Sequence, residues 1–109
     1  MRTDEDVKKD IMQIKNLFNR LRVMKEREIV MTRLGKMINP GEIREMNELA
    51  SNIEAIIRRN TSIVNFRTRK LFEAEKYNYE MTVKSWENRK KMALAALERN
   101  LKEKDKETK

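Results

Sequence analysis

The N-terminal third of the chain has a regular pattern of hydrophobic and polar positions. Its apolar residues follow one another at alternating spacings of four and three: Val7, Ile11, Ile14, Phe18 and Leu21. This heptad pattern is typical of an amphipathic helix that packs along one stripe. Thr3, followed three residues later by Asp6, resembles a capping box. We therefore predict a first helix over residues 3–38.

The segment Asn39-Pro40-Gly41 ends this first pattern. Proline disfavours helical conformation in the residue before it. Asn39 is nevertheless a favourable N-cap, and Pro40 is tolerated at the first position of a new helix. A second helix is therefore predicted over residues 40–76. So short a connection favours an antiparallel hairpin.

The end of the second helix has weaker markers, because no Gly or Pro follows position 41. Two polar segments, 60–62 and 77–79, are candidate interruptions. We favour a bend within residues 76–82, and a continuous helix to about residue 103 is the alternative. A third helix is predicted over residues 80–104. Residues 105–109 are predicted to form a charged, solvated tail.

These patterns predict an all-α fold, a long antiparallel helical hairpin plus a third C-terminal helix. The arrangement is bundle-like or coiled-coil-like, with a single helical domain over residues 3–104. Hydrophobic residues make up 39% of the 109 residues and aromatic residues 6%, so the chain has little material for a large core. We therefore expect it to share a core with another copy, as a homodimer in the first instance.

The stretch from Ile53 to Leu71 joins an apolar stripe to a basic one. Placed on one helix, its aliphatic residues gather on one side, and four cations gather on the other: Arg58, Arg59, Arg69 and Lys70. The formal net charge of +8 favours polyanionic partners. A basic helical face of this kind would bind phosphates with strong salt dependence and little sequence selectivity. The alternatives are an acidic protein partner or an ordinary solvated face.

A second basic cluster lies nearer the C-terminus, beside the aromatic residues Tyr77, Tyr79 and Trp86. Its members are Lys84, Arg89, Lys90 and Lys91. Aromatic side chains beside cations can stack on bases and bind the nucleic-acid backbone. The alternative is that these aromatic residues belong to the core or to a subunit interface.

Two polar residues, Asn60 and Arg67, fall within the apolar stripe of the predicted second helix. A buried, unpaired arginine is costly, so Arg67 needs a partner. In an antiparallel hairpin it lies level with Asp10, which is on the apolar side of the first helix. We therefore predict an Asp10–Arg67 pair. The alternative is that the side chain of Arg67 reaches the surface.

The chain contains no Cys and no His. Disulfides, thiolate metal sites and the Ser-His-Asp and Cys-His types of catalysis are therefore excluded. We expect no enzymatic activity, no metal and no cofactor. The three-helix layout is shared with small chorismate mutases, but their arginine and acidic pattern is missing from residues 11–30. No apolar run approaches the length needed to span a bilayer, and the charged N-terminus is unlike a secretory signal. The expected location is intracellular (cytoplasmic), or within a virion.

The stretch IVNFRTRKLFEA, preceded by the helical NELASNIEAIIRR, resembles the helix of GINS replication proteins that ends in an R-x-x-K-[I/L] pattern. Arg67, Lys70 and Leu71 match that pattern, whereas the Asp-Phe-Tyr motif expected upstream is missing. The resemblance covers about a quarter of the chain and implies a replication or repair accessory. The function expected is therefore non-catalytic binding of nucleic acid (DNA or RNA) or of a nucleic-acid-processing complex. The alternative is a scaffold that acts only through helix packing between proteins.

Overall fold

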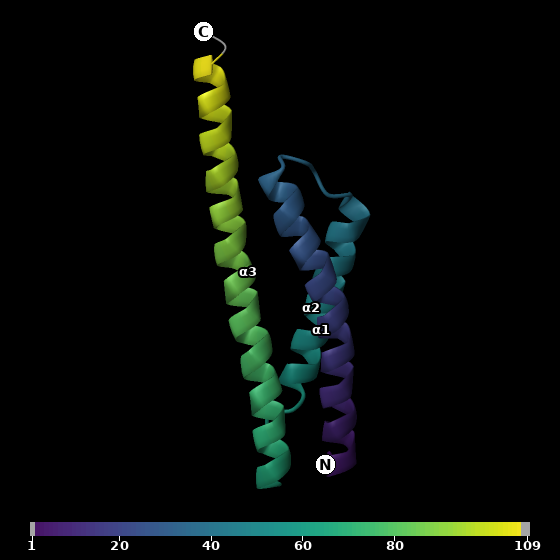
Figure 1. Ribbon diagram of the computed structural model, residues 1–109. Coiled ribbons are helices and arrows are strands. Elements are labelled where there is room, and N and C mark those ends of the chain that lie inside the picture. The colour runs from purple at the N-terminus through teal and green to yellow at the C-terminus, as the bar shows by residue number, and fades with distance from the viewer. Residues whose placement is uncertain (1, 108–109) are drawn as a thin grey trace.

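The computed structural model describes residues 2–107 of the chain, and their side chains as far as residue 104; this part is all-helical (Figure 1). Three helices follow one another: α1 (Asp4–Arg33), α2 (Pro40–Arg58) and α3 (Phe66–Glu107). The molecule is an elongated body of 68 × 25 × 16 Å. α1 and α2 form an antiparallel hairpin, as predicted. α3 begins beside the N-terminus and runs in the same direction as α1 (Figure 1).

α1 is the central helix of the fold. It packs against both α2 and α3, which have few contacts with each other. On α3 the buried apolar residues recur every seven positions: Phe72, Tyr79, Trp86 and Ala93. On α2 they are Met46, Leu49, Ile53 and Ile56. α1 therefore buries two adjacent faces, one against each neighbour, and this explains the width of its apolar stripe.

Aromatic packing joins α1 to α3. The ring of Phe18 lies edge-to-face with Tyr79 at a centroid distance of 5.4 Å and with Trp86 at 5.9 Å. All three side chains are almost completely buried. Edge-to-face pairs of this kind stabilise a core by about 0.5–1.5 kcal/mol each beyond their burial. Tyr79 and Trp86 are therefore part of the intramolecular core.

The predicted starts of the first two helices are confirmed, whereas the predicted start of a third helix at residue 80 is wrong, because α3 begins at Phe66. The hydroxyl of Thr3 accepts a hydrogen bond from the Asp6 N–H, and the Asp6 carboxylate accepts one from the Thr3 N–H. This reciprocal pair is a capping box. At the second start, Asn39 is the N-cap and its side-chain oxygen accepts from the Gly41 N–H at 2.8 Å. Pro40 is the first residue of α2.

The predicted end of the first helix at residue 38 is wrong, because α1 ends at Arg33. Gly35 has φ +70, which is the left-handed conformation that glycine adopts without strain. Its N–H donates to the Thr32 carbonyl at 3.0 Å, and the Lys36 N–H donates to the Met31 carbonyl at 2.9 Å. These two bonds define a Schellman motif. A methyl group on Gly35 would lie 3.2 Å from Leu97, so this turn also contacts α3 closely.

The second helix also ends earlier than predicted. α2 stops at Arg58 instead of residue 76, and α3 is continuous through the predicted bend at residues 76–82. The interruption lies at residues 59–65, which we call the linker. Its first side chains are held by contacts outside the helix, as described below. α3 extends to Glu107 instead of ending at residue 104, and residues 108 and 109 of the predicted tail lie outside the described residues.

Candidate nucleic-acid interface

A buried carboxylate joins the N-terminus, α1 and the end of α2. Asp10 is 4% exposed, and the Arg59 guanidinium donates to both of its oxygens, at 2.6 and 3.1 Å. The Asn60 amide donates to Asp10 at 2.9 Å and to the Ile56 carbonyl at 2.7 Å. The Arg2 guanidinium completes the group by donating to Asp10 and to the Asn60 side-chain oxygen. We call Arg2, Asp10, Arg59 and Asn60 the Asp10 cluster.

The electrostatics of the Asp10 cluster favour the ionised carboxylate. Burial by itself would raise the pKa of Asp10, but hydrogen bonds from Arg59 and Asn60 and the charges of Arg2 and Arg59 outweigh it, so the pKa lies below its ordinary value. The bond to Asp10 likewise raises the pKa of Arg59. The cluster therefore stays charged at neutral pH and fixes the point where α2 ends.

The predicted Asp10–Arg67 pair is wrong. Arg67 lies at the exposed start of α3, and Arg59 is the residue of the linker that pairs with Asp10. The prediction assumed that the second helix continued through residue 67. Because α2 ends at Arg58, the chain turns before Arg67 can reach α1. Burial of Asn60, which was placed in the apolar stripe, is confirmed at 5% exposure.

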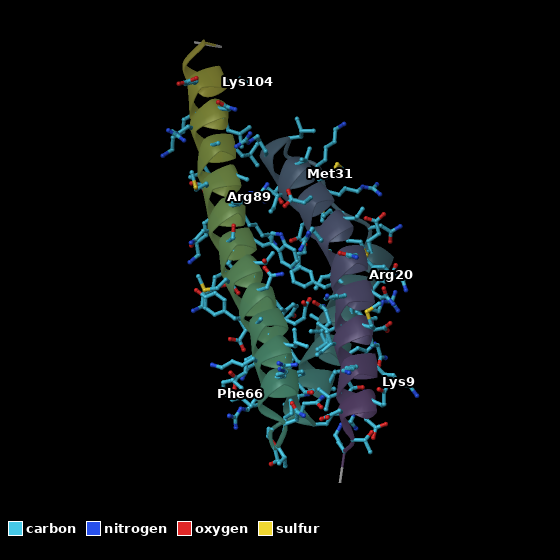
Figure 2. All side chains as sticks on the ribbon, turned by 60° about the horizontal axis from the view of Figure 1, so that its bottom comes forward. Lys9, Arg20, Met31, Phe66, Arg89 and Lys104 are labelled. Carbon is cyan, nitrogen blue, oxygen red and sulfur yellow. The ribbon has the colours of Figure 1, made fainter. Side chains whose placement is uncertain are left out.

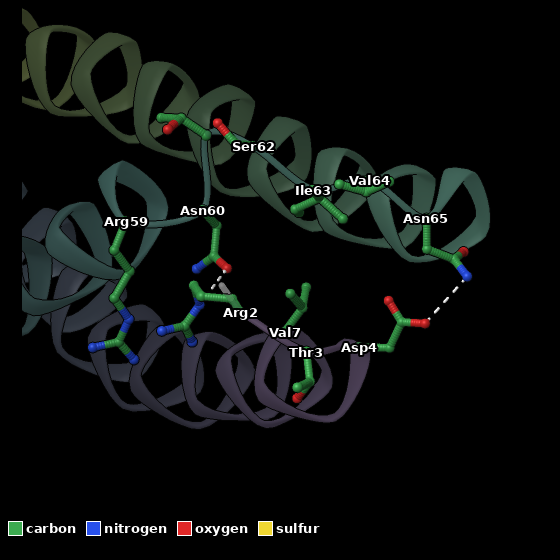
Figure 3. Close-up of a pocket in the computed structure, with 11 residues that line it drawn as sticks. Arg2, Thr3, Asp4, Val7, Arg59, Asn60, Ser62, Ile63, Val64 and Asn65 are labelled. Atoms are coloured by element: carbon green, nitrogen blue, oxygen red, sulfur yellow. Dashed lines mark hydrogen bonds between the residues drawn. The ribbon is translucent and has the colours of Figure 1, made fainter.

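An open cleft lies beside the Asp10 cluster, between the N-terminus and the linker (Figure 3). Arg2 and Arg59 line one end of it, with their guanidinium groups directed toward Asp10, and the apolar side chains of Val7 and Ile63 contribute to its wall. The Asn65 amide donates to Asp4 at 3.1 Å across its far end. Asp10 already neutralises the two arginines in part, so the cleft has little free positive charge.

The four cations of the predicted basic stripe do not share one helix. Arg58 is the last residue of α2, and Arg59 is bound to Asp10. Arg69 and Lys70 lie beyond the linker in the first turns of α3, where both cations approach the Phe66 ring. The expectation of a continuous basic face on one helix is therefore wrong, because the linker separates its two halves.

The second basic cluster divides into paired and unpaired cations. Arg89, which Figure 2 labels on α3, makes a two-pronged ion pair with Glu26 at 2.5 and 2.7 Å. Hydrogen bonding from Arg89 lowers the pKa of Glu26. Lys90 lies 3.6 Å from Glu28. The ion pairs of Arg89 and Lys90 therefore hold α3 against α1.

Lys84 and Lys91 are exposed and have no carboxylate partner within the described residues. They belong to a row of residues on α3 that recur every seven positions: Lys70, Tyr77, Lys84 and Lys91. Each residue of this row lies two positions before one of the buried apolar residues of α3. Two residues correspond to about 200° around a helix, so the row faces away from α1. Tyr77 is 66% exposed. We call these four residues the outer row.

Arg58 lies close to the outer row. It lines an open groove between α2 and α3 together with Lys84, and Ile57, Tyr79 and Val83 are among the other residues that line this groove. The structure therefore brings Arg58 and Lys84 together, although they belong to different predicted clusters. Carboxylates of Glu54, Glu80 and Glu87 lie along the same groove.

Sequence reasoning missed the acidic partners of the predicted cations and the contribution of Arg2. Glu26 and Glu28 form ion pairs with Arg89 and Lys90 because α3 runs parallel to α1. The sequence contains no marker of that register. The outer row could have been found, because it repeats the buried heptad of α3 with a shift of two residues.

No family model, curated protein or solved structure matches this chain. The resemblance to the GINS helix therefore has no support from these comparisons. Within the described residues, no group of three or more His, Cys, Asp or Glu could hold a metal ion. None of the helices in the same part of the chain has an apolar stretch long enough to cross a membrane.

Proposed function

We propose that this protein is a non-catalytic helical module that binds single-stranded nucleic acid along the outer row of α3. The observation that carries the proposal is the alignment of Lys70, Tyr77, Lys84 and Lys91 on the exposed side of one continuous helix. Proteins that bind single strands without sequence preference combine cations that follow the backbone with aromatic rings that stack on bases. The outer row supplies both chemical groups.

The dimensions of the row suit an extended strand better than a compact ligand. Lys70 and Lys91 are 21 positions apart, which corresponds to about 32 Å along a helix. Lys84 lies between these two lysines along the row, and Arg58 adds a further exposed cation beside Lys84. Tyr77 lies between Lys70 and Lys84, where a base could stack on its ring. Since contacts from lysines to phosphates carry no sequence information, binding would be weakly sequence-selective.

Salt dependence follows from the number of phosphates that the lysines neutralise. For single strands, the logarithm of affinity falls with the logarithm of salt concentration with a slope of about −0.7 per neutralised phosphate. Three lysines therefore give a slope of about −2, which corresponds to roughly 20-fold weaker binding at 200 mM than at 50 mM salt. A larger slope would indicate that Arg58 also contacts the strand.

The test is fluorescence anisotropy with labelled single-stranded DNA and RNA of mixed sequence. The triple variant with Lys70, Lys84 and Lys91 changed to Gln should lose most of its affinity. A matched control changes three exposed lysines of α1 that have no ion-pair partner in the described structure: Lys8, Lys9 and Lys15. The control has the same net charge as the triple variant. Equal losses in both variants would contradict a site on α3.

The alternative is a scaffold that acts through protein contacts, and one observation favours it. Several apolar side chains near the turn between α1 and α2 and near the end of α3 are largely exposed, including Leu34 at 60%, Met37 at 93% and Leu101 at 54%. Exposed apolar groups that lie together often mark protein interfaces. A scaffold of this kind, whether dimeric or coiled-coil-like, would give no anisotropy change with either nucleic acid.

A further inference from the structure

The linker between α2 and α3 is unusual because it contains no residue that prevents a helix. Residues 59–65 include neither Gly nor Pro. From residue 61 to residue 65, no N–H donates to a backbone carbonyl in the described structure. These five groups would all gain carbonyl partners if the linker became helical. The break is therefore maintained by other contacts.

Those contacts are made by side chains at the two ends of the linker. Asn60 donates to the Ile56 carbonyl and thereby caps the end of α2. Asn65 accepts from the Thr68 N–H at 3.2 Å and caps the start of α3. The same two residues bind α1, through Asp10 and Asp4. The middle of the linker, Thr61 and Ser62, is exposed and makes no hydrogen bond in the described structure.

α3 depends almost entirely on α1 for its position. Its contacts with α2 are few, and its buried residues Phe72, Tyr79, Trp86 and Ala93 form the face that packs on α1. An identical α1 from another copy would offer the same face. This is the condition for exchange of an element between protomers at low cost.

We propose that α3 exchanges between two copies of the chain, with the linker straightening so that residues 40–107 form one helix. Such a helix would be about 100 Å long. The proposal is independent of nucleic-acid binding by the outer row. The occupant of the α1 face in the dimer is the α3 of a second copy.

The directions of the helices permit this exchange. α2 runs opposite to α1, so a straightened helix would carry α3 away in the direction opposite to its own α1 (Figure 1). If a two-fold axis perpendicular to the straightened helix relates the two copies, the α1 of the partner runs in the opposite direction to the first α1. The exchanged α3 then lies parallel to the partner's α1, as it does within one chain. The Phe18–Tyr79 and Glu26–Arg89 contacts could therefore form again between copies.

The test uses linker variants that change helix propensity and leave the Asp10 cluster intact. Changing Thr61 and Ser62 together to Ala favours a straight helix, and changing the same two residues to Gly opposes it. Each variant is unfolded in denaturant, refolded at a series of protein concentrations and measured by light scattering. We expect the Ala pair to dimerise with a dissociation constant about tenfold below that of the unchanged chain, and the Gly pair to dimerise at least tenfold more weakly.

Cross-linking identifies which α1 each α3 contacts. Because the chain has no Cys, Glu26→Cys and Arg89→Cys introduce the only thiols, at a pair that is in contact across α1 and α3. A short bismaleimide should link them within one chain in the monomer and between chains in the dimer, giving a covalent dimer on a denaturing gel. An Ala-pair variant that remains monomeric at every concentration would overturn the proposal. So would a dimer whose links all lie within one chain.

Discussion

Replacement of Asp10 by Asn removes the charge around which the N-terminus, α1 and α2 are joined. The new amide could still accept a hydrogen bond through its one oxygen, but its NH₂ group would face the Arg2 and Arg59 guanidinium groups in place of an acceptor. Asp10 now receives bonds from Arg59 at 2.6 and 3.1 Å and from Asn60 at 2.9 Å. We expect Asp10→Asn to destabilise the folded protein substantially.

The size of the loss follows from these contacts. A hydrogen bond to a charged group contributes about 1.5–3 kcal/mol, and loss of one partner from a fully buried pair costs about 3–5 kcal/mol. Here the carboxylate is buried, but the side chains of Arg2 and Arg59 are 38% and 47% exposed and could regain water. We therefore expect a loss of about 2 kcal/mol in the free energy of unfolding. In a domain of this size, that corresponds to a decrease in Tm of about 10 °C.

Urea unfolding followed by far-ultraviolet circular dichroism measures this loss. Measurements at several protein concentrations separate it from any effect of dimer formation. Glu5→Gln is the matched control, since Glu5 lies in the same helix, is exposed and has no ion-pair partner in the described structure. A stability of Asp10→Asn within about 0.5 kcal/mol of this control would refute the assignment, because that difference is typical of a surface substitution.

The pH dependence provides an independent check. The pKa of Asp10 is lower in the folded protein than its ordinary value of 3.8, so folding favours the charged form. This stabilisation is fully present above the unfolded pKa and is lost as pH falls through the lower folded pKa. The difference between the unchanged chain and Asp10→Asn should therefore be constant near neutrality and decrease below about pH 4.

Three further predictions concern other contacts of the fold. Gly35→Ala should lower the free energy of unfolding in urea by about 1–2 kcal/mol, because an Ala at φ +70 is strained and its methyl group would approach Leu97. Unchanged stability of this variant would contradict the Schellman geometry. Arg89→Gln should lower the urea midpoint of unfolding only slightly, and by less still in concentrated salt, because the side chains of Arg89 and Glu26 are 46% and 43% exposed and water screens the pair. Burial raises the pKa of Tyr79 from its ordinary 10.0 to about 12, so the neutral phenol is favoured in the fold and stability should decline as pH rises above about 10. Tyr79→Phe should reduce that alkaline decline in thermal unfolding, and an identical decline would contradict the assignment.

The hairpin was predictable from local chemistry. The Thr3 capping box and the Asn39-Pro40 start each depend on residues within a few positions of one another, so the sequence alone determines them. Gly35 was an equally local marker of the end of α1. It was missed because the apolar pattern continues through Leu34 and Ile38, which satisfy the spacing without belonging to the helix.

The break after α2 coincides with one of the two candidate interruptions, residues 60–62, but local chemistry does not distinguish it from the favoured bend at residues 76–82. Residues 59–65 are compatible with a helix, and the contacts that interrupt it come from Asp10 and Asp4, about 50 and 60 positions earlier in the chain. The candidate site changed for the same reason. Once the break separates Arg58 from Lys70, the exposed cations must be grouped by their positions on α3 instead of their proximity in sequence.

The central position of α1 has a consequence for local unfolding. Because α2 and α3 have few contacts with each other, either can separate from α1 while the other remains in place. Amide hydrogens of α1 should then exchange with solvent only when the whole molecule opens, whereas those of α2 and α3 could exchange through two separate partial openings. The protein would therefore contain two cooperative units that share one helix.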